Sequence, residues 1–404
     1  MKFFAQVALL SACITSVVEL GALAGSHSSS LSRRTCKYKG AGKARLPSTI
    51  DASAGKPKST STSSSTTTVS TSAQPKATDT GVKSTAPSSG CFPSVGFKMP
   101  GSVPSSLDNW WCDTSSEYAF VGFSYAVDAC QSLDTLKREF KDIRNTFNGR
   151  YVRLYGACDK KGFYDNVVDA AWDAGIGVHA LIWFGFDGGN IYKTRRDSLF
   201  NTLKSNPKAK FVTRVVQYGS EPLFDHVLPA KELAKEVESA KATLSSLRIP
   251  VTVSELSFGY TQPGQDKAGA MAVLKAIDFV DAHILPLFAG GASTAKNAWG
   301  NVMGDIKWFS ENSGGKKIYL SENGWPSVKG QGNINPQSRT AVANVENEKD
   351  YFDMLDSKCS DLKAVKGGGV GWFAHLYSDS QGMGYGIYGT NGKLKFPFKP
   401  RTSC

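Results

Sequence analysis

The chain has 404 residues, of which 41% are hydrophobic and 11% aromatic, with 40 glycines and a formal net charge of +12. This composition excludes wholesale disorder, collagen and coiled coil, and it suits a large core with many tight turns. Residues 1–90 carry 11 Lys and Arg against 3 Asp and Glu, so only +4 of the charge belongs to residues 91–404. Because the positive charge is concentrated in the tail, we do not expect the folded part to bind nucleic acid.

The first 24 residues predict a secretory signal peptide. A basic start is followed by a mostly apolar run over residues 3–18, and Ala22-Leu23-Ala24 supplies the small residues that a signal peptidase needs. A membrane anchor is the alternative, but the run is broken by polar residues and is shorter than the roughly 20 residues that a bilayer requires. We therefore expect residues 1–24 to be removed and the protein to be secreted, extracellular or in a cell wall, with no membrane span.

Two further segments precede the folded part. Residues 25–58 are basic and are expected to be disordered or processed; Arg33-Arg34 would suit a dibasic protease, and Cys36 could be removed, free or bonded to another chain. Residues 59–90 are rich in Ser and Thr and cannot bury enough apolar surface to offset chain entropy. They predict a disordered linker that could serve as an O-glycosylated stalk.

Residues 91–404 contain six of the eight cysteines. An even number of cysteines in a secreted chain indicates disulfides, although six cysteines allow 15 pairings and the sequence does not choose among them. No C-x-x-C motif occurs and the five histidines are scattered, which argues against a zinc or haem site. We expect no metal and no organic cofactor.

After Gly90, short β-branched or aromatic runs alternate with amphipathic stretches. The eight strand candidates are 119–125, 151–156, 176–184, 211–219, 249–256, 279–288, 317–322 and 370–377. The helix candidates are 132–147, 164–174, 194–205, 231–246, 267–277, 295–312 and 338–358. This alternation indicates parallel strands joined by crossovers. Eight such units predict an α/β fold, a (β/α)8 TIM barrel formed by residues 91–404, rather than an open sheet with a glycine-rich phosphate loop.

Two of these strand candidates run into a glutamate, Glu221 after 211–219 and Glu322 at the end of 317–322. Pro222 favours an extended backbone at Glu221. Barrel enzymes place their chemistry at the carboxyl ends of the strands. Glycoside hydrolysis requires two facing carboxyl groups, so the pair predicts a catalytic site, whereas a single such glutamate would also fit an ion pair or a helix cap.

An arginine and a tyrosine lie in the second strand candidate. Arg153 interrupts an otherwise apolar strand, and a buried guanidinium needs a carboxylate partner. Pairing with Glu322 would keep that carboxylate ionised, and a purely structural ion pair is the alternative. Tyr155 could contact Glu322 or a bound sugar, and packing in the core is the alternative.

Three tryptophans and one more glutamate stand near other strand ends. Trp183, Trp325 and Trp372 could offer aromatic faces to a pyranose, with core packing as the alternative. Glu255 could contact sugar hydroxyl groups or form hydrogen bonds behind the site.

The motifs Arg153-Leu154-Tyr155-Gly156, Gly219-Ser220-Glu221 and Ser321-Glu322-Asn323-Gly324-Trp325-Pro326-Ser327 resemble those of glycoside hydrolase family 17, the β-1,3-glucanases, over most of residues 115–398. Within that family, the resemblance is to the fungal secreted or cell-wall branch. It implies a (β/α)8 barrel and retention of anomeric configuration, with Glu221 as acid/base and Glu322 as nucleophile.

The chain departs from this pattern at two positions. The wider clan usually has Asn before the acid/base, where it contacts the sugar 2-hydroxyl, and this chain has Ser220, whose hydroxyl has a shorter reach. The sixth strand carries His283-Ile284-Leu285-Pro286 where the family often has an Asn-containing step.

The resulting hypothesis is a monomeric, retaining endo-β-1,3-glucan hydrolase or transglycosylase whose partner is the polysaccharide. Two alternatives stay open. One is a weakly active or inactive β-glucan-binding wall protein, and the other is a related barrel glycosidase for β-1,6-glucan or another β-linked polysaccharide.

Overall fold

The computed structural model describes residues 90–185, 189–289, 291–292, 294–328, 340–382 and 384–404. The signal peptide, basic segment and Ser/Thr-rich linker predicted for residues 1–90 lie outside the described residues, apart from Gly90. Among the residues described, no helix has both the length and the apolar character needed to cross a bilayer.

The strands form a closed parallel barrel in which each strand pairs with the next in sequence and β8 pairs with β1. The strands are β1 Ala119–Ala126, β2 Tyr151–Tyr155, β3 Gly177–Leu181, β4 Thr213–Ser220, β5 Val251–Glu255, β6 Val280–Ile284, β7 Ile318–Asn323 and β8 Val370–Ala374. The predicted (β/α)8 barrel is confirmed, with all eight strand candidates in place.

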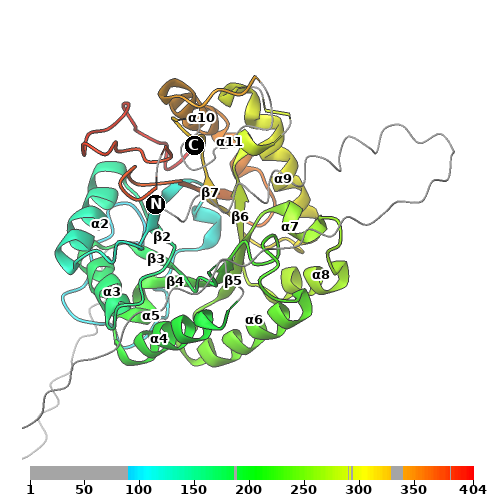
Figure 1. The fold of residues 1–404 in the computed structure, drawn as a ribbon. Helices are drawn as coiled ribbons and strands as arrows, with labels where there is room; N and C mark the ends of the chain where they lie inside the picture. The colour runs from blue at the N-terminus through cyan, green and yellow to red at the C-terminus, as the bar shows by residue number, and fades with distance from the viewer. Residues whose placement is uncertain (1–89, 186–188, 290, 293, 329–339, 383) are drawn as a thin grey trace, which may run out of the picture. The chain divides into compact units, whose positions relative to one another are not determined.

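Helices lie outside the strands and surround them as a ring (Figure 1). The α-helices are α2 Leu133–Phe147, α3 Phe163–Ala174, α4 Ile191–Ser205, α5 Ala209–Val212, α6 Ala230–Leu244, α7 Ser257–Thr261, α8 Lys267–Ala276, α9 Trp299–Asn312, α10 Val345–Ser357 and α11 Cys359–Lys363. Short 3-10 helices occupy Thr114–Ser116, Ser245–Leu247, Pro286–Phe288 and Ala295–Ala298. Since parallel strands need crossovers, this ring follows from the sheet topology.

Helix α2 illustrates how the sequence determines these elements. The Ser132 side chain caps its first turn by accepting a hydrogen bond from the Thr135 amide, and Asn148 ends it in the left-handed conformation. Buried apolar residues then recur at three- and four-residue spacing, which gives the helix one face toward the barrel.

The sixth strand is shorter than predicted. The sequence predicts a strand over residues 279–288, whereas β6 ends at Ile284 and a 3-10 helix begins at Pro286. Proline has no amide hydrogen to donate to the next strand, so the ladder stops before it. The third and eighth strands also end earlier than predicted, at Leu181 and Ala374.

All six cysteines of residues 91–404 are paired. The disulfides are Cys91–Cys112, Cys130–Cys158 and Cys359–Cys404. The pairing left open by the sequence is thereby resolved, and the predicted disulfides are confirmed.

A buried carboxylate lies inside the barrel at the amino ends of the strands. Glu117 accepts a hydrogen bond from the Tyr151 hydroxyl at 2.6 Å and another from the Tyr319 hydroxyl. The Arg150 and Arg214 guanidinium groups lie 3.6 and 3.4 Å from the same carboxylate. We call these five residues the Glu117 cluster.

Candidate active site

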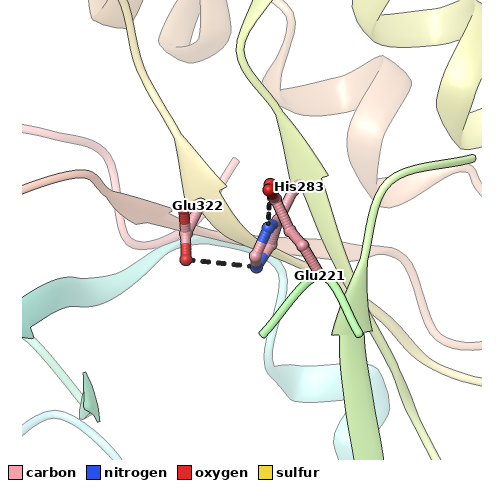
Figure 2. A group of neighbouring side chains, drawn as sticks. All are labelled: Glu221, His283 and Glu322. Atoms are coloured by element: carbon pink, nitrogen blue, oxygen red, sulfur yellow. Dashed lines mark hydrogen bonds and ion pairs between the residues drawn. The ribbon is translucent and has the colours of Figure 1, made fainter. Parts of the chain in front are cut away.

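Three ionisable side chains meet at the carboxyl ends of β4, β6 and β7. The His283 imidazole lies between two glutamates, with Nδ1 2.8 Å from Glu221 Oε1 and Nε2 3.3 Å from Glu322 Oε1 (Figure 2). A carboxylate oxygen of Glu221 lies within 4.8 Å of one of Glu322. The structure therefore brings together the two glutamates that the sequence places 101 residues apart.

Irregularities in strand pairing position these side chains. The register of β4 against β5 shifts between Gln217 and Ser220, and the register of β6 against β7 shifts so that His283 lies opposite Glu322. Such bulges re-aim side chains and are frequent beside active sites. Glu221 has φ 54°, a left-handed conformation that is unusual for this residue type, so the extended backbone predicted from Pro222 is wrong.

Arg153 is fully buried and organises the polar layer beneath the glutamates. Its Nη1 donates to Glu322 Oε1 at 2.5 Å, and its Nε donates to Gln217 Oε1 at 2.7 Å. Its Nη2 donates to Ser254 Oγ at 2.8 Å and to Ser220 Oγ at 3.1 Å. The Arg153–Glu322 ion pair expected from the sequence is present, in a network that fixes the guanidinium from several sides.

Each glutamate is held through one oxygen. Ser220 Oγ donates to Glu322 Oε1 at 3.0 Å, so Arg153, Ser220 and His283 all meet the same oxygen. Within the described part of the chain, no hydrogen bond or ion pair reaches Oε2 of either Glu322 or Glu221. One oxygen of each carboxyl group is thus left for chemistry, and the Glu221 side chain is 22% exposed.

The electrostatics of Glu322 favour its carboxylate form. Burial alone would raise its pKa, but the positive charges that His283 and Arg153 can present outweigh burial and hold the pKa of Glu322 well below its ordinary value. Asp225 is a further carboxyl group on the segment after β4, with its amide donating to Glu221 O at 2.9 Å. Burial, and then the charges of Glu221 and Glu322, raise the pKa of Asp225 to about 7.

Glu221, His283 and Glu322 are residue types that could also bind a metal ion. The Arg153 guanidinium, however, lies 3.1 Å from His283 Nε2 and donates to Glu322 Oε1. A cation in this group would face that fixed positive charge at close range. The arrangement suits proton transfer and nucleophilic attack better than metal binding.

Tyr155 and Trp183 are each half-buried rather than enclosed in the core. Tyr155 is half-buried, and its ring centroid is 5.9 Å from the Arg153 guanidinium carbon. Trp183 is half-buried beyond the end of β3, and the Arg195 guanidinium carbon lies 5.1 Å from its ring centroid. Both positions are compatible with the predicted substrate contacts.

Glu255 occupies a different position from the predicted sugar contact. It is buried, and its Oε2 accepts hydrogen bonds from the amides of Leu223 at 2.7 Å and Phe224 at 3.2 Å. Its Oε1 accepts from the Leu256 amide at 2.9 Å. Because both oxygens are engaged by the backbone, Glu255 fixes the segment that follows Glu221 rather than facing a ligand.

Trp325 and Trp372 are also in the core rather than open to a sugar. Trp325 is fully buried, and its indole donates to Val342 O at 2.9 Å. Trp372 packs against Phe120 and Phe352, with ring centroids 5.1 and 5.7 Å apart. Their sugar contacts were predicted from closeness to strand ends, and in this structure neither ring is accessible.

His283 is the main site residue that sequence reasoning missed. In the sequence, His283 stands out only because it begins the stretch where the family often has an Asn-containing step. Asp281 and His283 are two residues apart on the same strand, and alternate residues of a barrel strand face the same side. Two polar side chains that face one side of the barrel are a signal that could have identified His283. The register shift that puts His283 opposite Glu322 has no comparable sequence signal.

One protein-family model and several solved structures are similar to this chain. The model of the BtgE/BtgC glycoside hydrolase domain matches residues 121–376. A glycoside hydrolase family 17 β-1,3-glucanosyltransferase from Rhizomucor miehei is similar in structure, with TM-score 0.54 and 21% identity over 71% of this chain and 99% of that chain. An active-site mutant of the Rhizomucor miehei β-1,3-glucanosyltransferase in complex with laminaritriose gives TM-score 0.55 and 20% identity over 71% and 99%.

An endo-laminarinase from Formosa Hel1_33_131 gives TM-score 0.52 and 14% identity, covering 69% of this chain and 85% of that chain. At these identities the structural likeness concerns the fold. No curated protein matches in sequence. Because the domain model spans more than half of the residues, the chain belongs to the BtgE/BtgC glycoside hydrolase domain family.

Proposed function

We propose that this glycoside hydrolase is a retaining enzyme acting on β-1,3-glucan, with Glu221 as acid/base and Glu322 as nucleophile. The observation that carries the proposal is that one carboxylate oxygen of Glu221 lies within 4.8 Å of one of Glu322. Retaining glycosidases hold their carboxyl groups about 5–5.5 Å apart, whereas inverting enzymes need about 6.5–9.5 Å to admit a water molecule.

In the first step, Glu322 Oε2 attacks the anomeric carbon and the bond to the leaving oxygen breaks. Protonated Glu221 gives its proton to that oxygen from Oε2, the oxygen that His283 does not contact. Arg153 and Ser220 meanwhile hold Glu322 through Oε1, which orients the attacking oxygen. The product is a glycosyl ester of Glu322 and a shortened glucan.

In the second step, the Glu221 carboxylate takes a proton from the acceptor hydroxyl. The acceptor oxygen attacks the anomeric carbon, and Glu322 leaves as a carboxylate. Water as acceptor gives hydrolysis, and a sugar hydroxyl gives transfer. The solved structures of similar fold include an enzyme named for each reaction, a glucanosyltransferase and an endo-laminarinase.

The choice of substrate and location rests on separate support. The motifs around Arg153, Glu221 and Glu322 resemble those of the β-1,3-glucanases, and the family model is that of a glycoside hydrolase domain. Three disulfides are expected in an oxidising compartment, in agreement with secretion to the extracellular space or the cell wall. We expect the enzyme to act there as a monomer on wall glucan.

The test uses the full chain and β-1,3-linked gluco-oligosaccharides of defined length, with products followed by mass. Shorter products indicate hydrolysis, and products longer than the input indicate transfer. Glu322→Ala and Glu221→Gln should abolish either outcome. Turnover of β-1,6-linked oligosaccharides alone would contradict the proposed linkage, and a silent wild type would favour the glucan-binding alternative.

A further inference from the structure

Tyr155, His375 and Tyr385 form a continuous row of ring contacts, and the charge of Glu322 acts on all three; we call them the aromatic wall. The His375 ring centroid is 5.4 Å from that of Tyr155 and 5.2 Å from that of Tyr385. Gly324, two residues after Glu322, packs against this row, because a Cβ there would stand 2.9 Å from His375 O and 3.3 Å from Tyr385 Cδ1. His375 and Tyr385 therefore leave no room for a larger residue at position 324, two residues beyond Glu322.

Backbone hydrogen bonds fix the part of the wall that follows β8. The His375 amide donates to Asn323 O at 3.1 Å, which ties it to the residue after the nucleophile. The Leu376 amide donates to Tyr385 O at 2.7 Å. Asp379 Oδ1 accepts from two backbone amides of the same segment, at 3.0 and 2.8 Å. Tyr385 is therefore held at Glu322 by a built structure, although it lies 63 residues further along the chain.

Two polar atoms of the wall have no hydrogen-bond partner in the part of the chain that the structure describes. Tyr385 and His375 are each only 6% exposed, and neither Tyr385 Oη nor His375 Nδ1 has a hydrogen-bond partner among the described residues. Leaving a buried polar group unpaired costs free energy, and natural proteins satisfy most such groups. An unpaired phenol and an unpaired imidazole nitrogen beside one carboxylate therefore require an explanation.

Both groups are neutral at ordinary pH. Burial, and then the charge of Glu322, raise the pKa of Tyr385 above its usual range. Burial lowers the pKa of His375 to about 4, although the charge of Glu322 opposes this change. A neutral phenol can donate and accept a hydrogen bond, and so can a neutral imidazole. This is the chemistry that recognises a sugar hydroxyl, which is itself both donor and acceptor.

We propose that Tyr385 and His375 bind hydroxyl groups of the glucose unit that Glu322 attacks, so that the aromatic wall is the binding surface for the donor sugar. The inference rests on the function proposed above and adds the residues that recognise the reacting unit. The sugar completes the hydrogen bonds that the free protein leaves unmade. Aromatic side chains also suit the C–H surface of a pyranose. In the free protein the two unpaired groups lower the stability of the fold, and their hydrogen bonds to the bound sugar recover this free energy.

A second tyrosine in the same chain provides a matched control. Tyr164 in α3 is also buried, and its hydroxyl also lacks a partner among the residues described. Its pKa is raised by burial, with smaller effects from Arg195 and Asp159, and Glu322 is not among the charges that act on it. Removing either hydroxyl deletes the same atom from a similar environment, but only Tyr385 lies at the proposed sugar site.

The experiment compares Tyr385→Phe, Tyr164→Phe and wild type in the full chain. The donor is an aryl glycoside of a β-1,3-linked gluco-oligosaccharide, used intact and with single hydroxyls of the reacting glucose replaced by hydrogen. We expect Tyr385→Phe to lower kcat about tenfold to a hundredfold on the intact donor, because hydrogen bonds to the sugar strengthen in the transition state. Its Tm should not fall, since the hydroxyl has no partner to lose among the described residues.

The deoxy donors separate direct contact from a structural effect. On one of them, wild type and Tyr385→Phe should become equal, because the contact is already absent. Tyr164→Phe should keep wild-type kcat on every donor. The proposal is overturned if Tyr385→Phe keeps wild-type kcat, loses the same factor on all donors, or lowers Tm. A wild type that turns over no β-1,3-linked donor instead overturns the proposed function, and this inference with it.

Discussion

Two of the buried carboxylates lie toward opposite ends of the barrel, Glu117 at the amino ends of the strands and Glu322 at the carboxyl ends. Both meet an arginine, and both draw partners from β2 and β4. The Glu117 cluster uses Tyr151 and Arg214 from these strands, and the Glu322 site uses Arg153 and Ser220. The two ends are thus built from similar parts.

They differ in how the two oxygens are used. Glu117 is completely enclosed, and each of its oxygens accepts a tyrosine hydroxyl. Glu322 is held only through Oε1 among the described residues, and it faces a second carboxyl group across His283. A buried ion pair by itself therefore indicates structure. An oxygen with no partner among the described residues and a facing acid distinguish the end at which we propose the reaction.

The largest expected effects come from neutralising each carboxylate in turn. Glu322→Gln should lower turnover on the order of 10⁴-fold or more, because it removes the proposed nucleophile, and should also lower stability, since Arg153 loses its buried countercharge. Glu117→Gln should leave turnover per folded molecule unchanged but cost about 3–5 kcal/mol in the free energy of unfolding, since Arg150 and Arg214 lose their buried countercharge. Steady-state kinetics and urea unfolding measure both, and equal effects of the two variants on turnover would contradict the comparison.

The ion pair at the reactive end should control the acidic limb of the pH profile. Burial raises the pKa of Glu322, while His283 and Arg153 lower it, so Arg153→Gln should let that pKa rise. Since the nucleophile must be ionised, the acidic limb of kcat/KM against pH should move to higher pH. The same pairing stabilises the fold above the unfolded-state pKa of about 4.3, and this stability is lost as the pH falls below it.

Circular dichroism of Arg153→Gln at each pH separates loss of fold from protonation of the nucleophile. A folded variant whose acidic limb coincides with that of wild type would show that Arg153 does not set the ionisation of Glu322.

A smaller effect is expected at Ser220, which departs from the Asn of the wider clan. Its hydroxyl donates to Glu322 Oε1 and accepts from Arg153 Nη2. Ser220→Ala removes one of three contacts on Oε1, so kcat should fall about tenfold with KM nearly unchanged. A change in KM alone would indicate that Ser220 acts on the sugar rather than on the nucleophile.

The smallest catalytic effect is expected at Trp372. Trp372→Phe should cost about 2 kcal/mol of stability through lost packing against Phe120 and Phe352, with kcat/KM unchanged. Trp183→Ala is the matched variant at the half-buried position, and it should raise KM for gluco-oligosaccharides several-fold. If Trp372→Phe raised KM, Trp372 would contact the sugar, contrary to what its burial indicates.

The sequence predicted the barrel well because the fold depends on alternating patterns that recur along the chain. It also placed Glu221 and Glu322 at strand ends, since the strand candidates 211–219 and 317–322 run into these residues. It failed where the direction of a side chain matters. Phe373 faces the barrel interior beside His179, so its neighbour Trp372 must point outward to the helices. Whether a residue faces the barrel interior or the helices depends on its alternate position along the strand, and closeness to a strand end does not predict this.

Other features depend on contacts between distant segments. His283 comes opposite Glu322 through a register shift, and Tyr385 reaches the site through the segment after β8. Glu117 precedes the first strand and belongs to no motif. No local pattern specifies these positions, because each depends on how two or more strands are aligned in space.

Capture of the covalent intermediate tests the central claim most directly. An aryl β-1,3-gluco-oligosaccharide with fluorine at C2 of the reacting unit should slow the second step and leave a glycosyl ester on the enzyme. Peptide mass spectrometry should then find one adduct, on Glu322. An adduct on Glu221 or Asp225, or release of product with inverted configuration and no adduct, would contradict the account.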